Sequence, residues 1–404
     1  MAKLFEKSTI KSMELKNRII RSSTVDSMCD DGNPTEMHYK LFEKLAKGGT
    51  GLIITGMSYV SQDGRHLTPA MCLAIDKDEQ IPKLKALTDH VHQYDTKIAM
   101  QIGHCGRQTS LKALGTIPMA PSPVKEKIGK DIPREMTEED IERTIEAFSE
   151  AARRVKESGF DAVQINANHG YLVNQFLSPY TNRRKDKWGG TVENRMRFVI
   201  EIYKRCRVSV GEEFPVFIKM NAYDNMKNGL KLDEGVVMAQ MMAEAGFDGI
   251  EVSCGIMEDG WSFLRGNFPV EIFIDDLGMF KNPIIAFIMR RFGRKLIKTP
   301  AFKVAFNREN AKLIKSKVDV PVFVVGGLND PKVINDIIES GDADYVALSR
   351  PLIKNPSFPN RIKEGNDEPS KCISCNHCLP YLLMAPLRCY NGKSIRIRKD
   401  KKEE

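Results

Sequence analysis

The sequence has 404 residues, of which 42% are hydrophobic and 28% are charged. This composition is typical of a folded globular protein and argues against disordered, collagen-like and low-complexity classes. Sixty-one basic residues against fifty-three acidic ones give a net charge of +8, and residues 281–298 alone carry six Lys or Arg and no acid. Because so much of the excess is local, the charge balance does not indicate a nucleic-acid partner.

The chain shows no targeting or membrane-spanning pattern. Its first residues, MAKLFEKSTIKS, lack the apolar core of a signal peptide. The most apolar run, residues 283–289, is far too short to span a bilayer. We therefore expect a cytoplasmic protein without a transmembrane segment.

Eight short apolar runs recur along the chain, and helical patterns separate most of them. We expect strands at Ile19–Ser22, Gly51–Thr55, Lys97–Ile102, Asp161–Asn166, Val216–Asn221, Gly249–Ser253, Val320–Val325 and Tyr345–Leu348. One of the helices, expected over residues 137–158, begins with Thr-Glu-Glu-Asp, which supplies a cap and negative charge at its start. Eight alternating strand–helix units predict an α/β fold, a (β/α)8 TIM barrel.

Two segments depart from the barrel repeat. Residues 255–305 are about twice as long as a repeat requires, and we interpret them as an insertion over the barrel mouth. Its aromatic and basic-apolar residues predict a lid helix packed on the barrel, with a membrane-surface or partner helix as the alternative. We therefore divide the chain into a barrel, residues 1–366 with the 255–305 lid insertion, and a cysteine-rich segment with a charged tail, residues 367–404.

Polar residues follow the third and fourth expected strands, where a parallel barrel has its active site. The segment from Gln101 to Arg107 offers an amide, an imidazole and a guanidinium, which suit a heterocycle with mixed hydrogen-bonding edges. Asn166 and His169 are spaced to donate hydrogen bonds to one oxygen that gains negative charge, and Tyr171 is a nearby proton source. The alternative is that these side chains only satisfy backbone groups at the strand ends.

The remaining strand ends suggest a phosphate group. Lys219 lies inside an apolar strand, and if it faces the barrel interior it requires an anionic partner. The last two strands end in Gly326-Gly327 and Ser349-Arg350, at the loops that frequently bind phosphate in this fold. No dinucleotide-binding or P-loop glycine motif occurs. The phosphate is therefore expected to belong to a flavin mononucleotide (FMN) held in the barrel.

Several motifs, taken together, resemble the old yellow enzyme family of FMN-dependent NAD(P)H:flavin oxidoreductases over about residues 3–365. They are Leu15-Lys16-Asn17-Arg18-Ile19, the 101–107 segment, His169-Gly170-Tyr171-Leu172, Phe176-Leu177-Ser178-Pro179, Trp188-Gly189-Gly190-Thr191-Val192-Glu193-Asn194-Arg195 and Arg350-Pro351-Leu352-Ile353-Lys354-Asn355-Pro356. The resemblance implies flavin contacts from Ser23, Thr24, Gly56, Gln101 and Lys219, and phosphate contacts from Gly326, Gly327, Ser349 and Arg350. It also implies that Asn166 and His169 hold the carbonyl oxygen of the substrate and that Tyr171 donates a proton. The first member of that pair is Asn here, where His is usual, and Ser349 replaces a commoner glycine.

Four cysteines follow the last barrel unit with the spacing Cys372-x2-Cys375-x2-Cys378-x10-Cys389. Thiolates at this spacing suit an iron–sulfur cluster or zinc. The segment resembles the cluster segment of dienoyl-CoA reductases and trimethylamine dehydrogenase, which implies a [4Fe–4S] cluster; zinc and free thiols are the alternatives.

These features predict an enzyme that reduces the C=C bond of an α,β-unsaturated carbonyl compound, with FMN as cofactor. NAD(P)H or a protein electron donor would supply the electrons, and the aromatic-rich insertion favours a bulky apolar enone such as a steroid or enoyl compound. A homo-oligomer is compatible with the sequence. Two alternatives are an oxidative flavoenzyme of the amine-dehydrogenase type that passes electrons to a cluster, and a non-catalytic binding protein.

Overall fold

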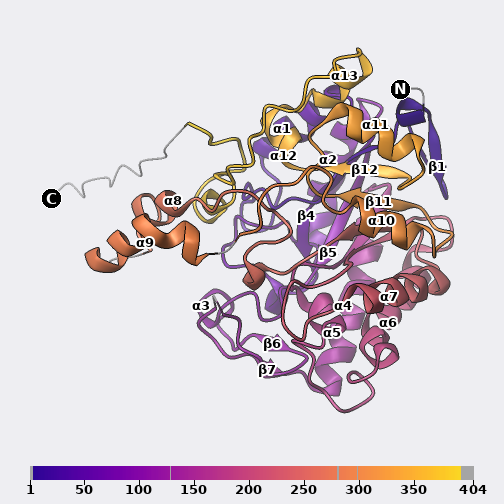
Figure 1. Ribbon diagram of the computed structural model, residues 1–404. Helices are drawn as coiled ribbons and strands as arrows, with labels where there is room; N and C mark the ends of the chain where they lie inside the picture. Colours follow the sequence, from indigo (N-terminus) through magenta and orange to yellow (C-terminus); the bar gives the residue numbers. More distant parts are fainter. Residues whose placement is uncertain (1–2, 128, 280–281, 298, 393–404) are drawn as a thin grey trace.

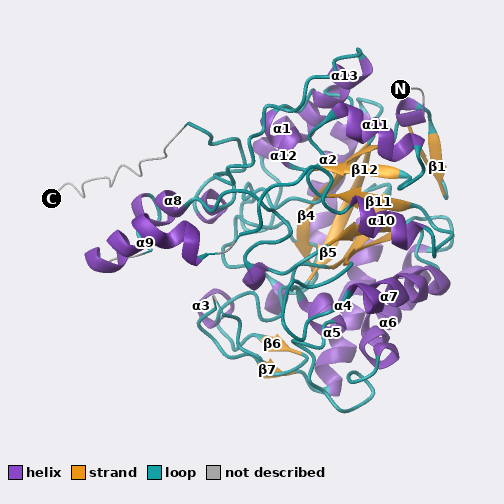
Figure 2. Cartoon of the chain, viewed as in Figure 1, coloured by secondary structure: helices purple, strands orange, loops and turns teal. Residues whose placement is uncertain are grey.

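A computed structural model describes residues 3–127, 129–279, 282–297 and 299–392. Phe280, both ends of the basic run 281–298 and the charged tail 393–404 lie outside the described residues. Eight parallel strands close into a barrel with helices around it (Figures 1 and 2). The strands, in order around the barrel, are β3 (Ile19–Arg21), β4 (Leu52–Tyr59), β5 (Lys97–Gly103), β8 (Ala162–Ala167), β9 (Val216–Asn221), β10 (Gly249–Ser253), β11 (Val322–Val325) and β12 (Tyr345–Leu348).

All eight predicted strands are confirmed, and they differ from expectation only at their ends. Strand β4 continues to Tyr59 past a register shift between Ile54 and Met57. Strand β11 begins two residues later than expected, after Pro321, which has no N–H to give to a sheet.

The helices pack outside the barrel and bury the other face of the strands. The longer ones are α1 (Glu36–Lys47), α2 (Ile81–His92), α4 (Glu138–Glu157), α6 (Val192–Val210), α7 (Leu232–Ala245), α10 (Arg308–Lys315) and α11 (Pro331–Glu339). Shorter ones are α3 (Leu111–Leu114), α5 (Leu172–Leu177), α12 (Arg350–Lys354) and α13 (Phe358–Lys363). Helix α4 begins as predicted, because the Thr137 hydroxyl accepts from the N–H of Asp140 while the Asp140 carboxylate accepts from the N–H of Thr137.

One end of the barrel is closed by the chain itself. A hairpin of β1 (Ser8–Ile10) and β2 (Met13–Leu15) places Ile10, Met13 and Leu15 against apolar residues that point into the barrel, including Phe217 and Phe323. This plug lies at the end where the strands begin. The opposite, carboxyl end is therefore the one available for a site.

The insertion after β10 has two parts. Residues 255–268 lie near the barrel end, since Ile256 bridges to His169 and Phe263 stacks on the ring of His169. Helices α8 (Val270–Asp275) and α9 (Pro283–Leu296) then project away from the barrel (Figure 1). Helix α9 packs against α8, whereas most of its large apolar side chains are exposed. None of the helices in the described part of the chain combines the length and apolar character needed to cross a bilayer.

Candidate active site

A buried ion pair lies inside the barrel at neighbouring strands. Lys219 on β9 pairs in register with Glu251 on β10, and Nζ of Lys219 lies 2.9 Å from a carboxylate oxygen of Glu251. Lys219 is only 3% exposed, and it also donates to the hydroxyl of Ser22 at 2.7 Å. Ser22 in turn donates to Glu251 at 2.5 Å. The anionic partner that the sequence required for an inward-facing Lys219 is thus Glu251.

Two amides extend this ion pair across the barrel. Gln164 on β8 donates to Glu251 at 2.9 Å, and Gln101 on β5 donates to the Gln164 carbonyl oxygen at 2.7 Å. The carbonyl oxygen of Gln101 then accepts from Ser23 and from Asn166, each at 2.9 Å. An unbroken row of hydrogen bonds therefore connects Lys219 with Asn166. Its side-chain amides and hydroxyls offer both donors and acceptors to a bound heterocycle.

Thr24 and Gly56 lie next to this row. The hydroxyls of Thr24, after β3, and Ser349, after β12, are 2.9 Å apart. Gly56 faces the backbone of Thr24 so closely that an added Cβ would lie 3.0 Å from the Thr24 carbonyl oxygen. The strands that carry Thr24, Gly56 and Ser349 are adjacent in the barrel, which brings these three residues to one side of its carboxyl end.

A pocket opens where β11 and β12 end, and its lining includes Gly326, Gly327, Asn329, Ser349 and Arg350. Gly327 has a φ of +71°, and an added Cβ would lie 2.4 Å from the Lys303 carbonyl oxygen. The two glycines therefore hold a left-handed, closely packed backbone. The Oδ1 atom of Asn329 is buried without a hydrogen-bond partner. An amide oxygen only accepts hydrogen bonds, so this atom would pair with a donor and not with an anion. What fits a phosphate group here is the guanidinium of Arg350 beside two glycines that allow a close approach to the backbone.

His169 stands between the barrel and the insertion. Its Nε2 lies 2.7 Å from the Ser253 hydroxyl, and its ring stacks on Phe263 with centroids 4.2 Å apart. Burial lowers the pKa of His169 well below its usual value, and the charge of Lys219 acts in the same direction. The imidazole is therefore neutral near pH 7 and offers one N–H donor.

Tyr171 begins helix α5 and faces a different group of side chains. Its hydroxyl lies 3.4 Å from Nε2 of His66, and its ring packs with a buried cluster that includes Met57 and Cys105. Burial raises the pKa of the Tyr171 phenol well above its usual value. The phenol thus keeps its proton at neutral pH. No hydrogen bond among the described residues joins Tyr171 to Asn166 or to His169.

Three members of the hydrogen-bonded row, Ser22, Gln164 and Glu251, were not identified from the sequence. Gln164 and Glu251 carry the same signal that drew attention to Lys219, a polar residue inside an otherwise apolar strand. Arg107, by contrast, forms a buried ion pair with Glu258 and donates to backbone carbonyls, which is a structural role.

One of the C-terminal cysteines lines the pocket at the ends of β11 and β12. Cys372, Cys375, Cys378 and Cys389 are all partly exposed, whereas the other five cysteines are buried. Cys372 lines the pocket together with Arg350, and the Arg350 guanidinium interacts electrostatically with three of the four thiols. Burial raises the pKa of the Cys378 thiol to about 12, although the charge of Arg350 opposes this effect.

The spacing of these sulfur atoms bears on the choice of metal. Zinc holds each thiolate at about 2.3 Å, so four thiolates around one zinc ion lie within about 4 Å of one another. In the described part of the chain, the four cysteines form no set of three with ligand atoms within 4.8 Å of one another. In an iron–sulfur cluster the four thiolates bind separate irons and stand further apart. In the described residues, the four sulfur atoms are thus not gathered as closely as thiolates around one zinc ion.

The one compact set of possible ligands in the described residues is Asp26, Cys29 and His38, all buried. Nδ1 of His38 accepts from the N–H of Thr35 at 3.1 Å, so a neutral ring carries its proton on Nε2. That Nε2 faces Asp26 at 3.3 Å and Cys29 at 3.8 Å. A protonated Nε2 has no lone pair for a metal. These residues therefore form a buried hydrogen-bonded group.

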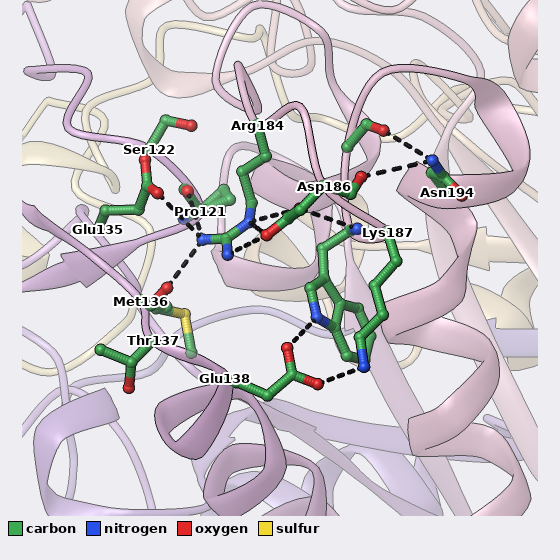
Figure 3. A network of polar contacts seen from close by, with 12 residues as sticks. Pro121, Ser122, Glu135, Met136, Thr137, Glu138, Arg184, Asp186, Lys187 and Asn194 are labelled. Atoms are coloured by element: carbon green, nitrogen blue, oxygen red, sulfur yellow. Dashed lines mark hydrogen bonds and ion pairs between the residues drawn. The ribbon is translucent and has the colours of Figure 1, made fainter.

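The motif around Trp188 has a structural role away from the site (Figure 3). The Trp188 indole donates to Glu138 at the start of α4 at 2.6 Å, and Arg184 pairs with Asp186 and donates to the carbonyl of Met136. Asn194 donates to the Gly189 carbonyl from the first turn of α6. The motif thus joins α4, α6 and the loop that carries the short strands β6 (Met119–Ala120) and β7 (Arg134–Glu135).

The barrel agrees with comparisons to known proteins. The sequence model of the NADH:flavin oxidoreductase / NADH oxidase family matches residues 3–272 and 292–368. The chain therefore belongs to this family of FMN-dependent oxidoreductases. This membership supports an enzyme over a non-catalytic binding protein.

The relatives fall into two length classes. An NADH oxidase of Thermoanaerobacter brockii is 35% identical over 92% of this chain, and a cinnamate reductase of Clostridium sporogenes is 31% identical over 92%. The chain spans only 52% and 54% of these two proteins. An NADPH dehydrogenase of a Geobacillus species is 34% identical over 88% of this chain and is matched over 92% of its own length.

Solved structures repeat this fold. A 2-naphthoyl-CoA reductase bound to 2-naphthoyl-CoA superposes with a TM-score of 0.82 at 26% identity, covering 96% of this chain and 56% of that one. A morphinone reductase superposes with a TM-score of 0.70 at 24% identity, covering 90% of this chain and 91% of that one, and shows the fold alone.

Proposed function

We propose that this chain reduces the C=C bond of an α,β-unsaturated carbonyl compound with electrons from NAD(P)H or from a protein donor. The observation that carries the proposal is the buried row of side chains from Lys219 to Asn166, with His169 beside it, at the carboxyl end of the barrel. Bound FMN supplies the hydride chemistry there.

The residues that would hold FMN form two groups. Ser23, Thr24, Gly56, Gln101 and Lys219 would contact the ring system, and Gly326, Gly327, Ser349 and Arg350 would bind the phosphate. The mixed donors and acceptors of the row suit the flavin heterocycle, and the positive charge of Lys219 would stabilise negative charge on it. The guanidinium of Arg350 and the two crowded glycines, which line one pocket, support the phosphate end.

Asn166 and His169 would hold the carbonyl oxygen of the substrate. Each donor aimed at an oxygen that gains negative charge contributes on the order of 10²–10³ in rate. A neutral His169 donates without altering the net charge of the site. Tyr171, which keeps its proton at neutral pH, would protonate the α-carbon of the substrate.

The relatives support a bulky apolar substrate. One relative is named for cinnamate and one structural neighbour for 2-naphthoyl-CoA. Phe263, which covers His169, supplies an apolar surface at the same place. A steroid-like or enoyl compound is the substrate class we propose.

Cys372, Cys375, Cys378 and Cys389 would hold a [4Fe–4S] cluster. Their partial exposure beside the phosphate pocket, and sulfur spacing wider than zinc requires, support this assignment. The cluster would either receive electrons from a protein donor or stabilise the segment.

The function is tested on protein purified without oxygen and assayed for NADH and NADPH oxidation with cinnamaldehyde as the enone. We expect enone-dependent oxidation, and at least a 10²-fold loss in the double variant Asn166→Ala/His169→Ala with FMN still bound. His92→Ala, which removes a histidine at the other end of the barrel, should keep full activity. Unchanged turnover in the double variant would refute the role of the pair. Bleaching of the flavin by amines without any enone reduction would instead establish the amine-dehydrogenase alternative.

The cluster is tested by iron and sulfide analysis of the same sample. We expect about four irons per chain and a broad absorption that bleaches with dithionite. Stoichiometric zinc, or no metal, would refute it.

A further inference from the structure

Helix α9 exposes a row of large apolar side chains. Ile284 and Phe287 are 68% and 66% exposed, and Ile285, Ile288, Phe292 and Leu296 are also exposed. A spacing of four residues places Ile284, Ile288, Phe292 and Leu296 along one side of the helix. Soluble proteins rarely leave such a continuous apolar row uncovered.

The other side of α9 holds the helix in place. Gly293 is buried, and a Cβ added there would lie 3.1 Å from the side chain of Val270 on α8. Ile272 of α8 packs in turn with Tyr381 and Tyr390 of the C-terminal segment. The apolar row is therefore presented outward by a supported arm (Figure 2).

The sequence around the apolar row is rich in basic residues. The sequence has no acidic residue from position 277 to 308, and this stretch includes Arg290, Arg291, Arg294 and Lys295 within α9 itself. Arg290 pairs with Asp275 of α8, whereas Arg291 is exposed and lies over the ring of Phe292. The outward surface of the arm thus combines large apolar side chains with cations.

Most of the arm lies outside the common family pattern, because the family model passes over residues 273–291. Its function is therefore expected to be particular to this chain and independent of the flavin site. At about 1.5 Å per residue, its 14 residues extend about 21 Å, less than the roughly 30 Å core of a bilayer.

We propose that α9 docks the protein on an anionic lipid surface. The helix would lie in the plane of the membrane, with Ile284, Phe287 and Phe292 among the acyl chains and Arg291 at the head groups. A second copy of the chain fits this surface less well. In a two-fold contact through α9, each cationic helix would face its own copy without an acid on either helix to compensate.

The proposal is tested by sedimenting the FMN-loaded protein with vesicles of phosphatidylcholine alone or mixed with phosphatidylglycerol. We expect binding to the anionic vesicles that weakens as salt increases. Phe287→Asp should lower the partition coefficient at least about tenfold. Arg291→Gln should lower it about fivefold.

Control variants on other helices distinguish a loss of vesicle binding caused by changes in α9 from one caused by any change of a surface residue. Val208→Asp replaces an apolar residue of α6 that is 85% exposed, and Lys83→Glu reverses an exposed charge on α2. Both should bind anionic vesicles like the unchanged protein, and all four variants should retain FMN.

Three outcomes would overturn the proposal. They are no binding to anionic vesicles, equal binding to neutral and anionic vesicles, and binding that Phe287→Asp leaves unchanged. Sedimentation velocity without lipid adds a further check. A dimer that Phe287→Asp dissociates, together with no vesicle binding, would assign the surface to a second copy of this chain.

Discussion

The Arg350 guanidinium donates a 2.6 Å hydrogen bond from Nη1 to Oδ1 of Asn376, which joins the end of β12 to the cysteine segment. Asn376 is itself held by two donations from its Nδ2, to the carbonyls of Arg265 and Asn267. Arg350 also donates to the carbonyls of Leu264 and Arg265. The proposed phosphate ligand is thus positioned by the insertion and by the C-terminal segment.

Asn376→Ala should weaken FMN binding. The substitution removes one of the acceptors that orient the partly buried guanidinium of Arg350, whose Nη1 keeps only the Arg265 carbonyl, and we expect it to raise the Kd for FMN about tenfold. Fluorescence titration of the FMN-free protein measures this Kd. Asn366→Ala, an exposed position just before this segment, serves as the control. An unchanged Kd for Asn376→Ala would show that Arg350 does not depend on this contact.

Glu251→Gln should destabilise the barrel. Lys219 and Glu251 are both buried, so removing one partner leaves an uncompensated charge at a cost of about 3–5 kcal/mol. Thermal unfolding should show a lower Tm, and Lys219→Met added to Glu251→Gln should restore part of it without restoring FMN binding. Glu201→Gln, which removes a surface pair with Lys204, should change stability by at most about 0.5 kcal/mol. A Tm for Glu251→Gln equal to that of the unchanged protein would contradict a buried ion pair between Lys219 and Glu251.

Gly327→Ala should abolish FMN binding. The new Cβ would lie 2.4 Å from the Lys303 carbonyl oxygen, and because that atom is backbone, the pocket itself must shift. Gly190 has a similar φ of +86° but no atom within 4 Å of an added Cβ. Gly190→Ala should therefore cost only the strain of a left-handed alanine, about 1 kcal/mol, with FMN still bound. FMN content after purification distinguishes the two variants, and equal content would refute the steric argument.

Glu126→Gln should stabilise the protein increasingly as the pH rises from about 4.5 to about 7, and fully above that. Burial has the largest effect on Glu126, and the net result is a pKa raised from 4.5 to about 7. The charge of Arg107, second in size, lowers this pKa, and the repulsion of Glu258, third in size, raises it. The folded protein therefore holds this proton more tightly than the unfolded chain does. The contribution of this proton to the free energy of unfolding is fully present below about pH 4.5. It is lost as the pH rises through about 7, and the total loss is about 3 kcal/mol.

Thermal unfolding at about pH 5 and about pH 8 tests this dependence. The variant and the unchanged protein should have nearly the same Tm at the lower pH, and the variant should be the more stable one at the higher pH. Glu212→Gln, an exposed control, should show no such difference. A stabilisation that is the same at both pH values would contradict the raised pKa.

The sequence by itself determined the barrel and much of the candidate site. The barrel was predictable because each β-branched run is long enough to be a strand and too short to be a buried helix, and because apolar strands alternate with helices in only a few folds. Lys219 was predictable because a charge inside an apolar strand is costly unless another group compensates it.

Only the tertiary structure decided which residues meet. Glu251 is the partner of Lys219 because β9 and β10 are neighbours in register, and a sequence without pairing information does not specify register. The contact of Arg350 with Asn376 joins residues 26 positions apart through a segment without regular structure, which has no periodic signal. The sequence did not determine whether the apolar face of α9 is covered. An amphipathic pattern predicts a helix, but it does not predict which element packs against that helix.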